Sequence, residues 1–228
     1  MKSGYRIFAY FGLASVFGSL LYGFRSAPDA PHINYALNVI LYLAFAAPHL
    51  LFTRSWMKQT VWGHPNGSHF ERRVYITVSL LLWYAVLVFH LPVSGFTFQL
   101  PEWARFIAML GFLLGVMAFF EGATFANIDG LLGVHGSTMS HSHGPETPLI
   151  TEGAYSKVRH PMYRAALFAG VCSVFLHGTA ASLLWALMIG ATFLLFIPIE
   201  ERQLVAARGD AYREYCKQTP YRLLRGVW

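Results

Sequence analysis

Six apolar stretches dominate this 228-residue sequence, and together they leave little chain for a separate water-soluble domain. A run of roughly 20 apolar residues is long enough to cross the hydrocarbon core of a bilayer as a helix. Only 12% of the residues are charged, against about 25% in soluble domains. The sequence therefore predicts an all-α, polytopic transmembrane helical bundle. The expected spans are residues 5–24, 33–52, 74–93, 103–125, 165–177 and 180–199.

The fifth stretch is the exception in length. Residues 165–177 are only 13 in number, so this helix either begins inside the preceding polar segment or stops short of a full crossing, which leaves five complete spans as the alternative. With the sixth stretch it is expected to form a helical hairpin that turns at Gly178. We divide the chain into four N-terminal membrane helices, residues 1–126, and a catalytic region with a charged tail helix, residues 127–228.

Basic residues are distributed very unevenly about these spans. With six crossings, 15 of the 17 Lys and Arg residues share one side with both termini. Basic loops mark the cytoplasmic side of a membrane protein, so we expect both termini and the active site in the cytoplasm, in a bacterial inner membrane. The net charge of +6 is then a signal of topology, and we predict no nucleic-acid partner.

A polar segment before the fifth span carries the most chemistry, in the run from Gly153 to Tyr163. Pro161 suits the first turn of a helix, where its missing N–H costs nothing, and it favours an extended chain before it. The free amides at such a helix start form an anion site with Arg159 and His160. The alternative is a basic cap whose side chains extend toward lipid head groups.

Two further features leave functional and structural interpretations open. The pair Glu200–Glu201 directly follows an apolar span, where acids are costly unless they face a polar cavity or a cation; alternatively, the helix emerges into water there. The loop histidines His135, His141 and His143 contain an H-x-H pair, but no third ligand with known geometry accompanies it. We predict no metal site. The two cysteines form no metal-binding pair, and the sequence has no Walker loop or dinucleotide-binding motif.

Three blocks with fixed spacing resemble the integral-membrane methyltransferases, a group that includes isoprenylcysteine carboxyl methyltransferase, phospholipid N-methyltransferases and NnrU-like proteins. The strong resemblance covers residues 149–220. Upstream, residues 127–133 and His49 with the 71–75 segment look like the methanethiol S-methyltransferase branch. The residues of the three blocks are Gly153, Tyr155, Arg159, His160, Pro161 and Tyr163, then Glu200, Glu201, Arg202 and Leu204, then Gly209, Asp210, Tyr212 and Tyr215.

The resemblance implies S-adenosyl-L-methionine as cofactor, bound on the cytoplasmic side of the last helices. Either acid of the Glu200–Glu201 pair is suited to the amino group or ribose of the cofactor, and tyrosine faces are suited to its sulfonium. We predict three catalytic residues, Arg159, His135 and Glu201. The expected cofactor-binding residues are His135, Tyr155, Arg159, His160, Pro161, Tyr163, Glu200 and Glu201.

The same resemblance leaves the methyl acceptor open. We expect a small or lipophilic acceptor, and a thiol before the alternatives of a prenylcysteine carboxylate or an amine lipid. A thiol must react as its thiolate, so a nearby cation is needed to lower its pKa. Two other classes remain: an NADPH-dependent sterol reductase on the same fold, and a non-catalytic NnrU-like accessory protein whose His-rich loop handles metal.

Overall fold

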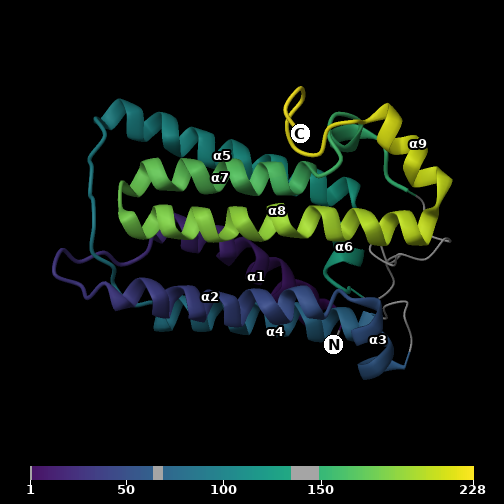
Figure 1. Ribbon diagram of the computed structural model, residues 1–228, viewed down its shortest axis with the longest axis horizontal. Coiled ribbons are helices and arrows are strands. Elements are labelled where there is room, and N and C mark those ends of the chain that lie inside the picture. The colour runs from purple at the N-terminus through teal and green to yellow at the C-terminus, as the bar shows by residue number, and fades with distance from the viewer. Residues whose placement is uncertain (1, 64–68, 135–148) are drawn as a thin grey trace.

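The computed structural model describes residues 2–63, 69–134 and 149–228, and within these ranges the chain is helical with no strand. The long helices run side by side along the long axis of the molecule, and the shorter helices gather at one end (Figure 1). The helices are α1 (Lys2–Tyr22), α2 (Ile33–Leu51), α3 (Ser55–Trp62), α4 (His69–Phe89), α5 (Glu102–Phe125), α6 (Ile128–Leu131), the 3-10 turn η1 (Gly153–Ser156), α7 (Pro161–His177), α8 (Ala180–Arg208) and α9 (Asp210–Gln218).

Five of these helices are long and apolar enough to cross a membrane: α1, α2, α4, α5 and α8. Many of their large apolar side chains point outward, such as Phe11, Ile40 and Leu195, which are all more than 60% exposed. In water such a surface would be unstable, whereas lipid solvates it. The predicted all-helical membrane bundle is confirmed. With 17 residues, α7 is shorter than these five but runs alongside α5 and α8 (Figure 1).

Most helix boundaries fall near the expected ones, and the differences have local causes. Helix α7, which corresponds to the fifth expected span, begins at Pro161, inside the polar segment, because proline is tolerated at the first helical position. It ends at Gly178, whose φ of +60° suits glycine and begins the expected hairpin turn. The expected spans leave residues 53–73 as a loop between them. This prediction is wrong in part, because the segment contains α3 and the first turn of α4. Helix α8 continues to Arg208 instead of ending at 199.

The closest helix pair is α5 with α7, and small residues make the approach possible. A Cβ atom added at Gly115 would lie 3.0 Å from both the backbone nitrogen and the Cβ of Ala169. Such small-residue contacts let membrane helices pack through their backbones. Phe17 and Leu20 of α1 close the other side of this pair and pack against Phe112. Helix α5 therefore belongs structurally with α7.

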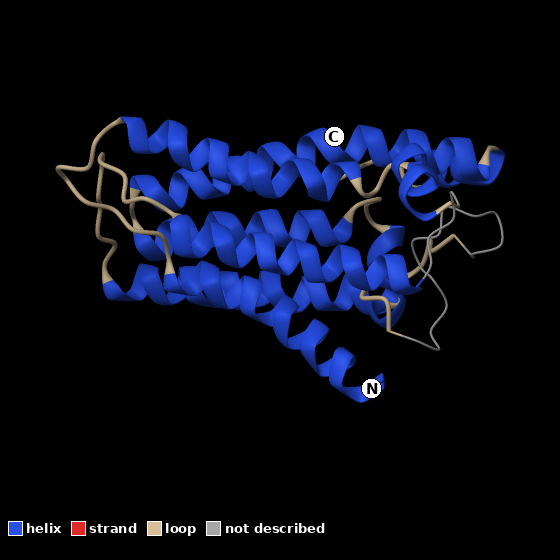
Figure 2. Cartoon of the chain, turned by 90° about the horizontal axis from the view of Figure 1, so that it is seen from below, coloured by secondary structure: helices blue, strands red, loops and turns tan. Residues whose placement is uncertain are grey.

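A second core, built from aromatic side chains, joins α2 and α4 to α8. Trp185 of α8 contacts Tyr42 of α2 edge-on at 5.2 Å and Trp83 of α4 at 5.7 Å. The hydroxyl of Tyr42 also lies 3.0 Å from the Thr192 hydroxyl on α8. Edge-to-face aromatic pairs add to burial energy and fix orientation. This core sets how α8 faces α2 and α4. Figure 2 shows the bundle from below, with the start of α1 diverging from it.

The two ends of the bundle differ in construction. At one end, at the left in Figure 1, lie the connections 23–32, 90–101 and 178–179, which we call the turn end. At the other end, at the right, lie α3, α6 and α9, and we call this the polar end. The long helices alternate in direction along the chain, so the described residues that follow α2 and α5 lie at the polar end.

Candidate functional site

A buried ion cluster at the polar end is centred on Glu201, which is 8% exposed. Its Oε1 accepts a hydrogen bond from Nε of Arg159 at 2.7 Å and lies 3.2 Å from Nε2 of His160. Its Oε2 accepts from Nε of Arg222 at 2.8 Å. Burying a carboxylate is costly unless it is paired and hydrogen-bonded. Glu201 meets that condition with three partners from two other segments of the chain.

The C-terminal tail is held against the Arg159–His160 segment by its backbone as well. Nη1 of Arg159 donates to the carbonyls of Thr219 at 2.9 Å and Pro220 at 2.7 Å. The backbone amides of Arg159 and His160 donate to the carbonyls of Tyr221 and Arg222. Burial alone would lower the pKa of Arg159, but the hydrogen bond and charge of Glu201 outweigh it and raise that pKa. Arg159 is therefore a permanently charged clamp between α8 and the tail.

Glu200 lies on a different face of α8 and has its own partners. The hydroxyl of Tyr163 donates to Oε2 of Glu200 at 2.8 Å, and Nδ1 of His160 lies 3.7 Å from the same oxygen. The rings of His160 and Tyr163 are stacked at 5.5 Å, and Tyr163 stacks on Phe193 of α8 at 4.7 Å. The two adjacent acids thus have different surroundings: Glu201 is enclosed by cationic side chains, and Glu200 faces aromatic rings.

Tyr155, in the 3-10 turn before α7, is a further aromatic residue at this end. Its carbonyl accepts a hydrogen bond from the hydroxyl of Tyr215 of α9 at 2.8 Å. Burial raises the pKa of the Tyr155 phenol, and the negative charge of Glu200 raises it further. Tyr155 therefore stays a neutral phenol. Such a ring can face a cation without competing with the carboxylate for it.

An open cavity of about 380 Å³ lies beside the cluster. This volume falls in the range of small-molecule sites. One face of α8 and the tail enclose it, so its wall carries a carboxylate, two guanidinium groups and apolar side chains. Its lining residues are Pro198, Glu201, Arg202, Val205 and Arg222.

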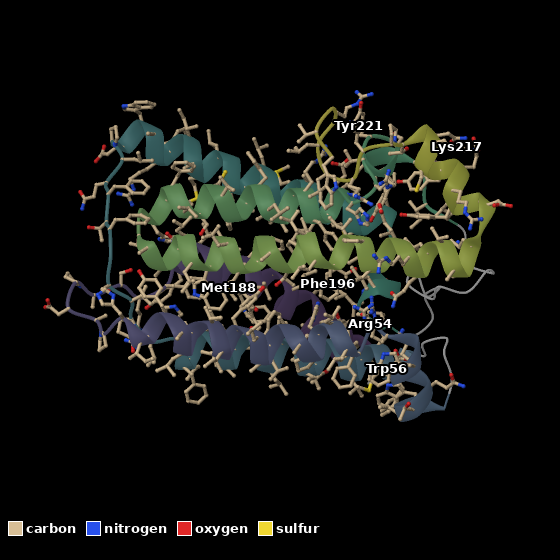
Figure 3. All side chains as sticks on the ribbon, viewed as in Figure 1. Arg54, Trp56, Met188, Phe196, Lys217 and Tyr221 are labelled. Carbon is tan, nitrogen blue, oxygen red and sulfur yellow. The ribbon has the colours of Figure 1, made fainter. Side chains whose placement is uncertain are left out.

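A second polar group lies across the bundle, where α2 and α4 face α8. The hydroxyl of Tyr75 lies 2.8 Å from Nε2 of His49, and Nδ1 of His49 lies 3.0 Å from the hydroxyl of Ser79. The His49 ring contacts Phe196 of α8 at 6.1 Å. Figure 3 shows Phe196 in the space between α8 and α2, one helical turn before Glu200. Through its contact with Phe196, this group adjoins the end of α8 that carries Glu200.

The structure brings most of the predicted site residues into one region. Tyr155, Arg159, His160, Pro161, Tyr163, Glu200 and Glu201 all lie at the polar end within the contacts described above. The predicted residue His135, like His141 and His143, lies outside the described residues. Sequence reasoning did not identify Arg222 as a site residue. The only signal was its basic character in the tail after Pro220.

Comparison with known proteins points to one kind of enzyme. The phospholipid methyltransferase family model matches residues 103–210, from the start of α5 to the start of α9. Methanethiol S-methyltransferase 1 of Bradyrhizobium diazoefficiens is 30% identical over 193 residues, which are 78% of this chain and 63% of that protein. The chain thus spans less than two thirds of that relative's length.

A second relative matches only a shorter part of the chain. Protein-S-isoprenylcysteine O-methyltransferase of Schizosaccharomyces pombe is 37% identical over 73 residues, 32% of this chain and 31% of that protein. No solved structure matches the chain. The resemblance to the membrane methyltransferases that the three sequence blocks indicated is confirmed by the family model and by both relatives.

Proposed function

Because this integral membrane protein is related to the membrane methyltransferases, we propose that it transfers a methyl group from S-adenosyl-L-methionine to a small thiol. The site is proposed to open on the cytoplasmic side, at the polar end that gathers most of the basic residues. The relative with the larger match is named for methanethiol S-methylation, and this favours a thiol over a carboxylate or an amine lipid.

One observation carries the proposal: Glu201, in the second sequence block, joins the first block and the C-terminal tail into one cluster. Arg159 and His160 come from the start of α7, Glu201 from the end of α8, and Arg222 from the tail. A buried charge network of this kind contributes little to stability compared with apolar packing of the same volume. Its value is positional, since it fixes the walls of the 380 Å³ cavity.

The residues present fit the proposed cofactor. S-Adenosyl-L-methionine carries an ammonium, a carboxylate and a sulfonium, and it supplies an electrophilic methyl group when bound. Glu200 offers a carboxylate for the ammonium or ribose, while Arg202 and Arg222 line the cavity and offer guanidinium groups for the carboxylate. The ring of Tyr155 is suited to the sulfonium, whereas the ring of Tyr163 is already stacked on His160 and Phe193.

The chain's own residues contribute mainly by positioning and by excluding water. Glu201 and Arg159 hold the start of α7 against α8 and the tail, and the stacked rings of His160, Tyr163 and Phe193 form an apolar wall. Methyl transfer is an in-line displacement, so orientation and desolvation can supply most of the acceleration. We propose that Arg159 acts by positioning, since Nε and Nη1 already donate within the protein.

The test is a binding and transfer experiment on the purified protein in detergent. Calorimetric titration with S-adenosyl-L-methionine is expected to give saturable binding. Incubation with the methyl-labelled cofactor and a panel of thiols, prenylcysteines and amine lipids is then expected to label a small thiol. No binding at millimolar cofactor would overturn the methyltransferase proposal. Label only in prenylcysteine or in lipid amine would keep it and reject the thiol.

A further inference from the structure

The His49–Tyr75 pair has no part in the cofactor site as described, yet it lies beside it. His49 stands in the last turn of α2, and Tyr75 and Ser79 stand one turn apart on α4. The three side chains form a hydrogen-bonded row, with 2.8 Å between Tyr75 and Nε2 and 3.0 Å between Nδ1 and Ser79. All three are half-buried in the bundle.

The surroundings of this row are apolar except on the side of Glu200. The His49 ring stacks on Phe45 at 5.5 Å and contacts Phe196 at 6.1 Å. The guanidinium of Arg72 lies 5.1 Å from the centre of the Tyr75 ring. Glu200, which accepts a hydrogen bond from Tyr163, stands one turn beyond Phe196 on α8. The charged groups facing the pair are therefore Arg72 from α4 and Glu200 from α8.

Resting on the proposed function, we propose that Tyr75 receives the proton of the acceptor thiol and passes its own proton to His49. The Tyr75 hydroxyl lies 2.8 Å from Nε2 and 3.1 Å from Nδ1 of His49, and Nδ1 also lies 3.0 Å from the Ser79 hydroxyl. The proposal assigns the proton of neutral His49 to Nδ1, toward Ser79, and leaves Nε2 as the acceptor. A thiol entering between α8 and the α2–α4 pair meets the Tyr75 hydroxyl on the side that faces Glu200 and Tyr163.

The proton step balances without any further reactant. The S–H bond of the thiol breaks, and its electron pair stays on sulfur. Tyr75 gains that proton as it loses its own, and an N–H bond forms at Nε2 of His49. The guanidinium of Arg72 favours the negative charge that develops on sulfur, and it opposes the positive charge that His49 gains. A thiolate is the form that reacts, so an apolar site needs such a proton acceptor close at hand.

The experiment compares two thiols in the wild type and in Tyr75→Phe. Positioned proton transfer contributes about 10²–10⁴-fold, so kcat for an alkyl thiol is expected to fall about 100-fold in the variant. For an aromatic thiol, which is already largely ionised at neutral pH, the expected fall is less than about tenfold. The affinity for S-adenosyl-L-methionine, measured by calorimetry, is expected to be unchanged. The rate of the variant with the alkyl thiol should recover as the pH rises and the thiol ionises in water.

Two further variants separate proton transfer from packing. His49→Gln is expected to show the same difference between the two thiols as Tyr75→Phe. Tyr42→Phe removes a comparable hydroxyl contact between α2 and α8, the 3.0 Å contact with Thr192, and is expected to leave both rates unchanged. Ser79→Ala removes one of the two hydroxyls near Nδ1 and leaves Tyr75 in place, so a smaller loss with the alkyl thiol is expected.

The outcomes distinguish this inference from the function it rests on. Equal losses with both thiols, unchanged rates, or loss of cofactor binding in Tyr75→Phe would each overturn the proton-transfer role. If the wild type binds the cofactor but methylates no thiol, the thiol-methylation proposal itself fails, and this appears in the first measurement before any variant is made.

Discussion

The two ends of this bundle are closed by different interactions. At the turn end, the connections are held by backbone hydrogen bonds, such as Phe98 N–H to the Gly178 carbonyl at 2.8 Å. Asn38 of α2 adds two bonds to the backbone of Leu91. At the polar end, ion pairs between charged side chains connect the segments, such as those of Glu201 with Arg159 and Arg222. Backbone bonds fix a turn at little desolvation cost, whereas buried ions are costly to maintain.

This difference indicates which end is built for binding. Backbone hydrogen bonds, which close the turn end, would also suffice to close the polar end if folding were the only requirement there. Lys58 and Glu71 form another buried ion pair at the polar end, at 3.1 Å. This placement of charge supports the proposal that the polar end binds the cofactor. Substitutions there should then weaken binding as well as stability, whereas substitutions at the turn end should lower stability alone.

The largest effect is expected from Glu201→Gln. The substitution leaves the buried side chain of Arg159 and the half-buried Arg222 beside a neutral amide, and removing one partner of a buried pair costs roughly 3–5 kcal/mol. We expect the dissociation constant for S-adenosyl-L-methionine to rise at least about 100-fold, the equivalent of about 2.8 kcal/mol, while the protein still folds. His160→Ala is expected to raise the same dissociation constant to a similar extent. Calorimetry in detergent and the far-ultraviolet circular dichroism spectrum check both.

The control for this prediction is Glu214→Gln on α9. Glu214 pairs with Lys217 at 3.0 Å on an exposed helix face at the same end of the bundle. Exposed pairs contribute little, so binding and stability are expected to stay as in the wild type. If Glu201→Gln and His160→Ala both retained full affinity, the cofactor site would have to lie elsewhere.

Gly178→Ala tests the opposite end. Gly178 has a φ of +60°, and a Cβ there would lie 2.0 Å from the carbonyl oxygen of Phe98. The strained backbone costs of order 1–3 kcal/mol, so thermal unfolding should begin at a lower temperature while cofactor affinity is retained. Gly190→Ala is the control, because its Cβ would meet only Leu167 at 3.6 Å. Lost binding in Gly178→Ala would contradict the separation of the two ends.

Thr179→Ala is a milder test of the same end. The Thr179 hydroxyl accepts from the Ser182 amide at 3.2 Å, and the Ser182 hydroxyl lies 3.3 Å from the Thr179 amide, which makes a capping box at the start of α8. Loss of such a cap costs about 1 kcal/mol. The midpoint of thermal unfolding in detergent should fall accordingly. Thr124→Ala is the control, because the Thr124 hydroxyl donates to the Phe120 carbonyl within α5, and its midpoint should not change. Equal decreases would mean that the cap has no special role.

The sequence predicted features that depend on neighbours in the chain. The apolar runs predicted the long helices, and Pro161 and Gly178 marked both ends of α7. The contact between Arg222 and Glu201 depends on the tail returning across α8, and no local pattern reports such a return. The His49–Tyr75 contact likewise depends on the rotation of α2 against α4, which the aromatic core sets and a hydropathy pattern does not contain.

The smallest expected effect is on the alkylation rate of Cys216 in α9. Burial raises the pKa of its thiol, and the nearby Arg159 lowers it only in part. Because only the thiolate is alkylated, the folded protein should react more slowly with iodoacetamide near pH 8.5 than after unfolding. Cys172→Ala leaves Cys216 as the single cysteine for this measurement. In Glu201→Gln the tail is expected to loosen and labelling to become faster, whereas Gly178→Ala should leave the rate unchanged. Faster labelling in both variants would show that the two ends are coupled, and the division between a binding end and a folding end would then be wrong.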